Sequence, residues 1–426
     1  MPQFPSTIVA EIQRYRQALA TLLIYGDSLE DAVGQAFTRL LDMVSSQSTT
    51  DSLRAYSQWF QALAQTQETW SSYLQRRILY ADNPFTQQVQ RQGLTTIPAA
   101  LALAARHDLS LLETLHSLTS QQMATWVQVV GGLENPPVAW DTVPPPLPFA
   151  FDPAQPWPKQ LEALATHYQG QGVGRLGQYH VFTWQDQALQ GVAHPDPVRL
   201  DSLTAYDHPR QQLRQNTLAL LRGYPALNVL LYGSRGSGKS SLVKALVNEY
   251  GPQGLRLVEV PKPALQALPQ IVDDLRHAPQ KFIVFVDDLS FEEDDDAFKS
   301  LKVVLEGSVT ARPQNVVVYA TSNRRHLVRE YFSDRPRPSD QDEVQSWDTV
   351  QEKLSFSDRF GLTLTFEPAD QPTYLAIVQH LAQQAHLPID DDTLRARALQ
   401  WATRHNGRSG RTARQFIDWI TAELAD

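Results

Sequence analysis

The first part of the chain carries apolar residues with the period of an α-helix. Apolar side chains recur every three or four residues over 29–44, and again over 53–63 and 70–74. This spacing gives each helix one apolar face that can pack against another helix. Ser28 and Asp31 have the spacing of a capping motif, so we predict that Ser28 caps the first of these helices. The pattern predicts an all-helical domain over residues 1–135, with a structural or partner-binding role.

Prolines interrupt this pattern. Nine of the 28 prolines lie between residues 136 and 158, and proline can continue neither a helix nor the middle of a sheet. We therefore predict a proline-rich linker over 136–158, followed by a connecting segment over 159–200. Within that segment four glycines lie close together, at 170, 172, 174 and 177, and they favour a loop.

From Val229 onward, short apolar runs alternate with helical patterns. The runs cover residues 229–232, 255–260, 282–286, 316–320 and 362–366. Buried parallel strands connected by helices explain this alternation most simply, so we predict an α/β domain over 201–369. The remaining residues, 370–426, show three helical patterns, near 372–386, 390–405 and 411–424.

Composition narrows the class of protein. The chain has 426 residues, of which 42% are hydrophobic and 19% charged, and no run approaches the roughly 18 apolar residues of a membrane span. The absence of cysteine excludes disulfides, iron–sulfur clusters and thiolate nucleophiles. Glu11 and Arg14 stand where a secretory signal needs apolar residues, so we expect a cytoplasmic protein. The net charge of -9 argues against a general nucleic-acid coat.

A phosphate-binding motif follows the first predicted strand. The sequence GSRGSGKS matches G-x-x-x-x-G-K-[ST] and precedes a helical pattern over 242–247. Glycines allow backbone amides to surround a phosphate, and the helix amino terminus adds a positive dipole. Lys239 is expected to reach the β- and γ-phosphates, and Ser240 to bind Mg²⁺. The residues expected to contact the nucleotide are Gly233, Ser234, Arg235, Gly236, Ser237, Gly238, Lys239, Ser240 and Ser241.

Two aspartates end the run over 282–286. We predict that Asp287 holds Mg²⁺ together with Ser240. Asp288 stands where a residue that orients the attacking water is expected. An aspartate is shorter than a glutamate by about 1.5 Å of reach, so efficient hydrolysis does not follow from the sequence. The acidic run over 292–296 is typical of a solvated helix start.

Further polar residues follow in a fixed order. The run over 316–320 leads into Thr321, Ser322 and Asn323, and Asn323 would lie beside the γ-phosphate. Arg359 lies in the sequence SDRFG, just before the last apolar run. Three arginines, Arg408, Arg411 and Arg414, lie in GRSGRTARQF, where the last helical pattern begins.

Together these motifs resemble those of the AAA+ ATPases. GSRGSGKS is similar to Walker A, FIVFVDD to Walker B, ATSN to the sensor-1 strand, SDRFG to the arginine-finger region and GRSGRTARQF to the sensor-2 helix. The resemblance implies a five-stranded parallel sheet of order 5-1-4-3-2 and a helical lid over 370–426. It also implies a homo-oligomeric ring, a hexamer in the common case, with Mg²⁺ and ATP between subunits.

The resemblance assigns further roles. Asn323 would polarise the attacking water, and Arg359 would act on the nucleotide of a neighbouring subunit. Arg414 would sense the γ-phosphate, with Arg411 as the second choice. In the sequence DSLTAYD, Leu203 and Tyr206 would contact adenine.

A closer resemblance covers residues 180–426. The strings YHVFTW, NVLLYGSRGSGKSSLVKAL, FIVFVDDLSFEE and EKLSFSDRFGL are similar to a bacterial AAA+ family catalogued as a domain of unknown function. This resemblance implies a fold and a nucleotide, and leaves the biological role open.

Three functions remain in competition. The first is an ATPase that remodels or assembles a protein client bound by the helical domain. Residues 259–263 lack the aromatic-apolar-glycine pattern of threading unfoldases, which disfavours threading. The second is a DNA-associated loader, in which Arg324, Arg325 and Arg329, or the arginines over 404–414, would contact phosphates. The third, suggested by Asp288, is a nucleotide-gated scaffold with little hydrolysis.

Overall fold

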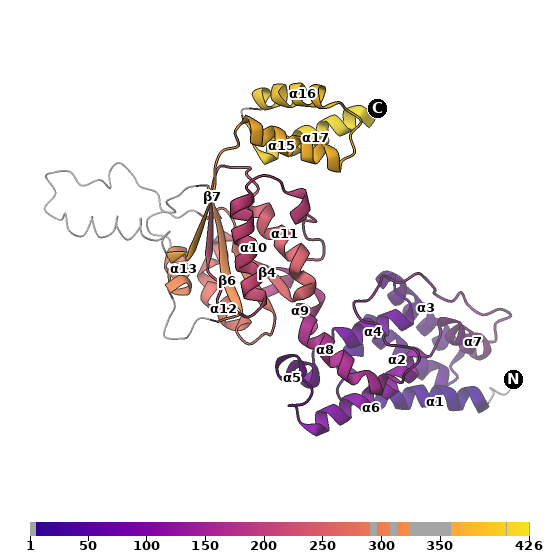
Figure 1. The fold of residues 1–426 in the computed structure, drawn as a ribbon. Helices are drawn as coiled ribbons and strands as arrows, with labels where there is room; N and C mark the ends of the chain where they lie inside the picture. Colours follow the sequence, from indigo (N-terminus) through magenta and orange to yellow (C-terminus); the bar gives the residue numbers. More distant parts are fainter. Residues whose placement is uncertain (1–5, 290–295, 307–312, 324–358, 406, 426) are drawn as a thin grey trace. The chain divides into compact units, whose positions relative to one another are not determined.

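A computed structural model describes residues 6–289, 296–306, 313–323, 359–405 and 407–425. The chain forms two compact units, residues 1–178 and 179–426 (Figure 1). Within the described residues, every helix is too short or too polar to span a membrane.

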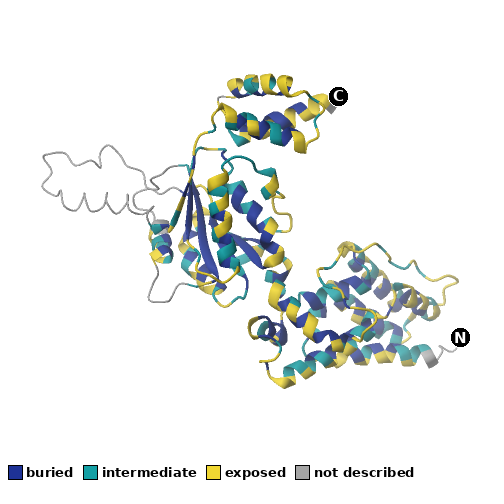
Figure 2. Cartoon of the chain, viewed as in Figure 1, coloured by how far each residue is buried: buried dark blue, intermediate teal, exposed yellow. Residues whose placement is uncertain are grey.

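The first unit is helical, as predicted. Its core contains stacked aromatic side chains: the rings of Phe37 and Trp70 lie 3.9 Å apart, and Trp59 meets Trp70 edge-on at 6.4 Å. All three are buried, and Figure 2 shows that buried residues recur along the helices of this unit. Its helices are α1 (Ser6–Ala20), α2 (Ala32–Ser45), α3 (Thr49–Thr66), α4 (Trp70–Leu79), α5 (Pro84–Gln92), α6 (Ala99–His116), α7 (Ser120–Gly131), α8 (Leu161–Gln171) and α9 (Gly174–Gln178).

Two local predictions in this unit were wrong. Helix α2 is capped by Asp31, whose Oδ1 accepts the N–H of Gly34 at 3.0 Å, and Ser28 lies in the preceding 3₁₀ turn Gly26–Leu29. The aspartate is the nearer cap because it directly precedes the helix. The glycines expected to form a loop lie largely in α8 and α9. Gly177 serves close packing, since a Cβ there would lie 2.7 Å from the carbonyl oxygen of Gly172.

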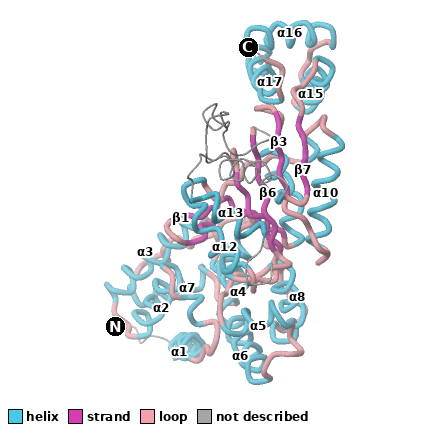
Figure 3. Tube along the Cα trace, turned by 90° about the vertical axis from the view of Figure 1, so that its left-hand side faces the viewer, coloured by secondary structure: helices cyan, strands magenta, loops and turns pink. Residues whose placement is uncertain are grey.

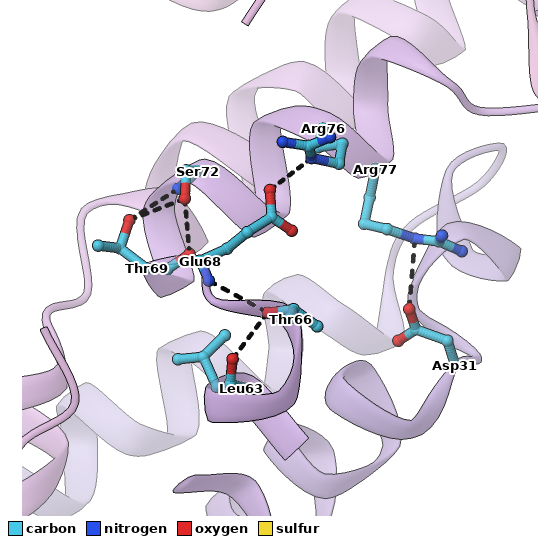
Figure 4. Close-up of polar contacts among 8 residues, drawn as sticks. All are labelled: Asp31, Leu63, Thr66, Glu68, Thr69, Ser72, Arg76 and Arg77. Carbon is cyan, nitrogen blue, oxygen red and sulfur yellow. Dashed lines mark hydrogen bonds and ion pairs between the residues drawn. The ribbon is translucent and has the colours of Figure 1, made fainter. Parts of the chain in front are cut away.

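The turn between α3 and α4 is held by polar contacts (Figure 4). The carboxylate of Glu68, only 5% exposed, accepts a hydrogen bond from Arg76. The backbone N–H of Glu68 donates to Thr66 Oγ1 at 3.3 Å, and Thr69 caps α4 by accepting from the N–H of Ser72. The buried carboxylate is therefore paired, which offsets its loss of hydration.

The proline-rich segment lies against the helices of the first unit. Tyr56 donates its hydroxyl to the carbonyl of Val138 at 2.7 Å, and the indole of Trp140 donates to the carbonyl of Glu68 at 2.8 Å. Phe151 stacks on Trp157 at 4.1 Å within the same core. The helical core therefore draws on residues beyond 135, and the predicted boundaries at 135, 158, 200 and 369 stay predictions.

The second unit is built on a seven-stranded sheet of order β2-β1-β4-β5-β6-β3-β7. All neighbours are parallel except β1 and β2. Figure 3 shows the strands in magenta, with helices beside them. Five strands match the predicted runs, and numbered in chain order they lie as 5-1-4-3-2, which confirms the expected core. The strands are β1 (Val181–Gln185), β2 (Ala188–Gly191), β3 (Val229–Gly233), β4 (Leu255–Glu259), β5 (Lys281–Val286), β6 (Val316–Ser322) and β7 (Leu362–Phe366).

Strands β1 and β2 were not predicted. They form a hairpin that extends the sheet beyond β4, and the two turn residues, Asp186 and Gln187, both have positive φ. A two-residue turn of this kind matches the right-handed twist of the strands.

Helices flank the sheet, and a separate group of three helices after β7 forms the lid. They are α10 (Asp207–Leu221), α11 (Lys239–Tyr250), α12 (Leu268–Leu275), α13 (Asp296–Glu306), α15 (Gln371–Gln384), α16 (Asp391–Arg404) and α17 (Gly410–Ala425). The last three match the three helical patterns and share a core in which Tyr374, Phe416 and Ile420 are buried. Because the core strands are parallel, the ends of β3, β5 and β6 bring their following residues to one edge of the sheet.

Candidate functional site

The loop between β3 and α11 is shaped by glycines. Gly233, Gly236 and Gly238 have φ values of 139°, 73° and 88°, which side chains with a Cβ rarely adopt. A Cβ at Gly233 would also lie 1.9 Å from the carbonyl oxygen of Phe366 on the neighbouring strand β7. The loop then leads into α11 at Lys239, so the helix amino terminus faces the same region.

Lys239 is held within this loop and is only 6% exposed. Its ammonium donates to the carbonyl oxygens of Gly233 at 3.0 Å and Ser234 at 2.7 Å, and lies 3.4 Å from Asn323 Oδ1. Burial lowers the pKa of Lys239, and the carboxylates of Asp287 and Asp288 oppose that shift. The buried ammonium is therefore a charge that an anionic ligand would stabilise.

Asp287 joins the loop to the sheet. Its Oδ1 accepts hydrogen bonds from Ser240 Oγ at 2.6 Å and from Thr321 Oγ1 at 2.5 Å. Ser240 is the second residue of α11, Asp287 follows β5, and Thr321 lies on β6. Three separate elements therefore converge on one carboxylate.

Asp288 has a left-handed backbone, with φ of 50°. Its N–H donates to Thr321 Oγ1 at 2.9 Å, and its Oδ1 accepts from Asn323 Nδ2 at 2.6 Å. The two ends of the Asn323 amide therefore reach Asp288 and Lys239. Thr321 was not predicted as a site residue, although it belongs to the polar triplet at the end of an apolar run, which was the signal that could have identified it.

These residues line a cavity of about 750 Å³, a volume within the range of small-molecule sites. The predicted residues that line it are Arg235, Gly236, Ser237, Gly238, Lys239, Ser240, Ser241, Asp287, Asp288, Asn323, Leu203, Arg411 and Arg414. Gly233 and Ser234 are not among the lining residues, and their carbonyl oxygens accept hydrogen bonds from the Lys239 ammonium.

The lid closes one side of the cavity. The N–H of Arg411 donates to the carbonyl of Gly236 at 3.3 Å, so the start of α17 contacts the loop between β3 and α11 directly. Arg411 and Arg414 both line the cavity, and the choice between them as sensor stays open. Ile377 and Leu381 of α15 add an apolar wall that the sequence analysis did not identify.

Two more predicted residues, Tyr206 and Arg359, also lie outside the cavity lining. The hydroxyl of Tyr206 donates to the carbonyl of Glu367 at 2.8 Å, and its ring lies 5.2 Å from that of Phe366. Arg359 forms an ion pair with Glu306 of α13 at 2.5 Å. The predicted action of Arg359 on a neighbouring subunit concerns an assembly, so it stays a prediction. The acidic run over 292–295 and the arginines at 324, 325 and 329 lie outside the described residues.

The chemistry of the site suits Mg²⁺. This ion prefers hard oxygen ligands and is commonly held by one or two protein groups together with phosphate oxygens. The Ser240 hydroxyl and the Asp287 carboxylate provide such oxygens, and a hydrogen bond of 2.6 Å between Ser240 Oγ and Asp287 Oδ1 holds the two groups together. Among the described residues, no group of three or more His, Asp or Glu side chains is placed to hold a metal ion by itself.

Comparisons with known proteins identify a family. The family described as protein of unknown function (DUF815) matches residues 177–424. Curated proteins yield no significant match. Among solved structures, a variant of RuvB from Thermotoga maritima aligns with 52% of this chain and 72% of its own, at 16% identity and a TM-score of 0.34. The structure described as the Thermotoga maritima RuvB Holliday junction branch migration motor aligns over the same shares, at 14% identity and a TM-score of 0.32. Superpositions this loose carry no functional conclusion.

Proposed function

Because the chain belongs to the DUF815 family, whose function is unknown, we propose a function from its site: a cytoplasmic, Mg²⁺-dependent AAA+ ATPase that couples ATP binding and hydrolysis to remodelling or assembly of a macromolecular partner. One observation carries this proposal. The loop between β3 and α11, Asp287 and Asn323 line a single cavity. In it, Ser240 donates a hydrogen bond to Asp287, and the ammonium of Lys239 lies 3.4 Å from Asn323 Oδ1.

Each of these residues would have a separate role in transferring the γ-phosphoryl group of ATP to water. The loop amides and Lys239 would hold the β- and γ-phosphates and stabilise the charge that develops on them. Ser240 and Asp287 would hold Mg²⁺, which supplies charge neutralisation when bound. Asp288 and Asn323 would orient the attacking water. Water adds to the γ-phosphorus, the bond to the bridging oxygen breaks, and ADP and phosphate leave.

Assembly would complete the site. Arg359 would reach the nucleotide of the next subunit in a ring, which we propose to be a hexamer, and this requires it to exchange its partner Glu306. Arg414 or Arg411 would respond to the γ-phosphate from the lid. The contact of Arg411 with Gly236 supports a link between the nucleotide and the lid, because a shift of the loop at Gly236 would also move the start of α17.

We propose that the helical unit binds a protein client. A DNA-associated role is less well supported, because Arg411 and Arg414, two of the arginines considered for phosphate contacts with DNA, line the nucleotide cavity. The net charge of -9 also disfavours DNA.

A nucleotide-gated scaffold is the second candidate, and Asp288 is the reason. Its carboxylate is short and accepts a hydrogen bond from Asn323 at 2.6 Å, so it must leave that partner or share it to orient water. Phosphate release under single-turnover conditions separates the two functions. The ATPase proposal expects release by the wild type, and loss of release with retained ATP binding in Asp288→Asn. ATP binding without release by the wild type, together with release by Asp288→Glu, would favour the scaffold.

A further inference from the structure

We propose that Thr321 is a positioning residue for the metal site: its hydroxyl fixes the Asp287 carboxylate so that one oxygen is engaged by the protein and the other is directed to the metal. The inference rests on the proposed function, because it assigns a task within the same site. Thr321 contacts Asp287 and Asp288 and would act on the metal only through them.

The hydroxyl of Thr321 both donates and accepts a hydrogen bond. It lies near the end of β6, and the side chain is only 2% exposed. Its proton is donated to Asp287 Oδ1 at 2.5 Å, while its oxygen accepts the N–H of Asp288 at 2.9 Å. The carbonyl of Thr321 also accepts the N–H of Leu289 at 2.7 Å. The chain from 287 to 289 is therefore attached to β6 at consecutive points.

These contacts place the two carboxylate oxygens of Asp287 in different hydrogen-bonding environments. Oδ1 accepts from Ser240 Oγ at 2.6 Å, from Thr321 Oγ1 at 2.5 Å and from the N–H of Asp288 at 3.2 Å. Within the described part of the chain, no hydrogen bond reaches Oδ2. A carboxylate oxygen offers about two lone-pair positions, so three donors saturate Oδ1, and Oδ2 is the oxygen left for a cation or for its bound water.

A purely structural role for Thr321 makes a different prediction. A β-branched residue suits a buried strand through its shape alone, and valine has nearly the same shape without the hydroxyl. If shape were all that mattered, Thr321→Val would leave the metal dependence intact. If the hydroxyl matters, Thr321→Ser, which keeps it, would behave as the wild type.

The test measures metal affinity without relying on turnover. Binding of a fluorescent ATP analogue to the full chain is followed while Mg²⁺ is titrated, and again in EDTA. For Thr321→Val we expect the half-saturating Mg²⁺ concentration to rise about tenfold or more, the range typical for loss of a residue that supports a metal ligand. Affinity in EDTA should stay unchanged, because the residues that hold the phosphates are intact.

Matched variants keep the outcome decisive. Thr217→Val removes a hydroxyl that is also buried, at 0% exposed, and donates to the carbonyl of Leu213, outside the cavity; it should leave the Mg²⁺ titration unchanged. Thr321→Ala is a second hydroxyl-free variant in case valine disturbs folding. An unchanged titration in the hydroxyl-free variants, or a shift in Thr321→Ser as large as in Thr321→Val, overturns the inference. A wild type that binds no nucleotide overturns the proposed function, and the inference with it.

Discussion

Replacement of Lys239 by methionine separates binding from stability. Methionine keeps most of the apolar stem of lysine and removes the ammonium. In the structure Lys239 is 6% exposed, and its ammonium donates to the carbonyls of Gly233 and Ser234. We expect Lys239→Met to lose most of its affinity for Mg²⁺ and ATP while the free protein stays as stable as the wild type.

The magnitude follows from the contacts that are exchanged. A hydrogen bond to a charged group contributes roughly 1.5–3 kcal/mol, so two bonds to phosphate oxygens contribute about 3–6 kcal/mol. The carbonyls that Lys239 leaves on binding offset part of this. We therefore take the lower end, about 3 kcal/mol, which corresponds to a roughly hundredfold rise in Kd.

The folding stability of the ligand-free protein should not fall when Lys239 is replaced. Burial lowers the pKa of Lys239, so folding disfavours the charged form of this side chain at neutral pH. That unfavourable contribution is relieved only as the pH rises towards 10.5, the ordinary lysine value. Removing the ammonium should therefore leave the melting temperature unchanged or raise it.

Calorimetric titration with ATP and a thermal melt measure the two effects. Lys244→Met is the matched control, because Lys244 lies on the same helix, outside the cavity, with its Nζ 3.9 Å from Asp196. The control should bind ATP normally. An affinity of Lys239→Met for ATP within threefold of the wild type would show that the ammonium contributes little to binding. A much lower melting temperature than that of Lys244→Met would show that the ammonium stabilises the free protein.

Three further outcomes are expected. Arg359→Ala should bind ATP as the wild type does but release little phosphate, because its arginine would serve the neighbouring subunit; normal phosphate release would contradict the shared site. Gly233→Ala should lower stability by at least about 2 kcal/mol, through its positive φ and a Cβ 1.9 Å from the Phe366 oxygen; a thermal melt like the wild type's would count against that clash. Burial, with the Arg256 guanidinium, lowers the pKa of His180 to about 4, so the unfolded chain binds more protons between pH 6.5 and 4 and stability falls as the pH drops through this window. Melting temperatures at pH 7 and 5 should therefore differ less in His180→Gln than in the wild type, and an equal difference would argue against this assignment.

The sequence predicted the nucleotide core well because its signals are local. Each core strand is a short apolar run bounded by polar residues, and the observed bounds differ from the predicted ones by at most two residues. The loop from Gly233 to Ser240 and the polar ends at Asp287 and Asn323 were visible as motifs. Their meeting in one cavity follows from the order of parallel strands.

Features that depend on packing could not be predicted in this way. The hairpin of β1 and β2 is short, and its turn uses Asp186 and Gln187 instead of glycine, so it lacks the usual turn signal. The hydroxyl of Tyr206 donates to the carbonyl of Glu367, a contact that no local pattern indicates, and its predicted contact with adenine stays a prediction. Thr321 became visible only through the hydrogen bonds of its hydroxyl, which no spacing along the chain reveals.

We propose that the loop from Gly233 to Ser240, together with Asp287, binds a nucleotide and Mg²⁺. Calorimetric titration of the full chain with ATP and with ADP, in the presence of Mg²⁺, measures this binding. We predict saturable binding of both nucleotides, with one site per chain. A folded protein that binds neither nucleotide would show that this loop is not a nucleotide-binding site.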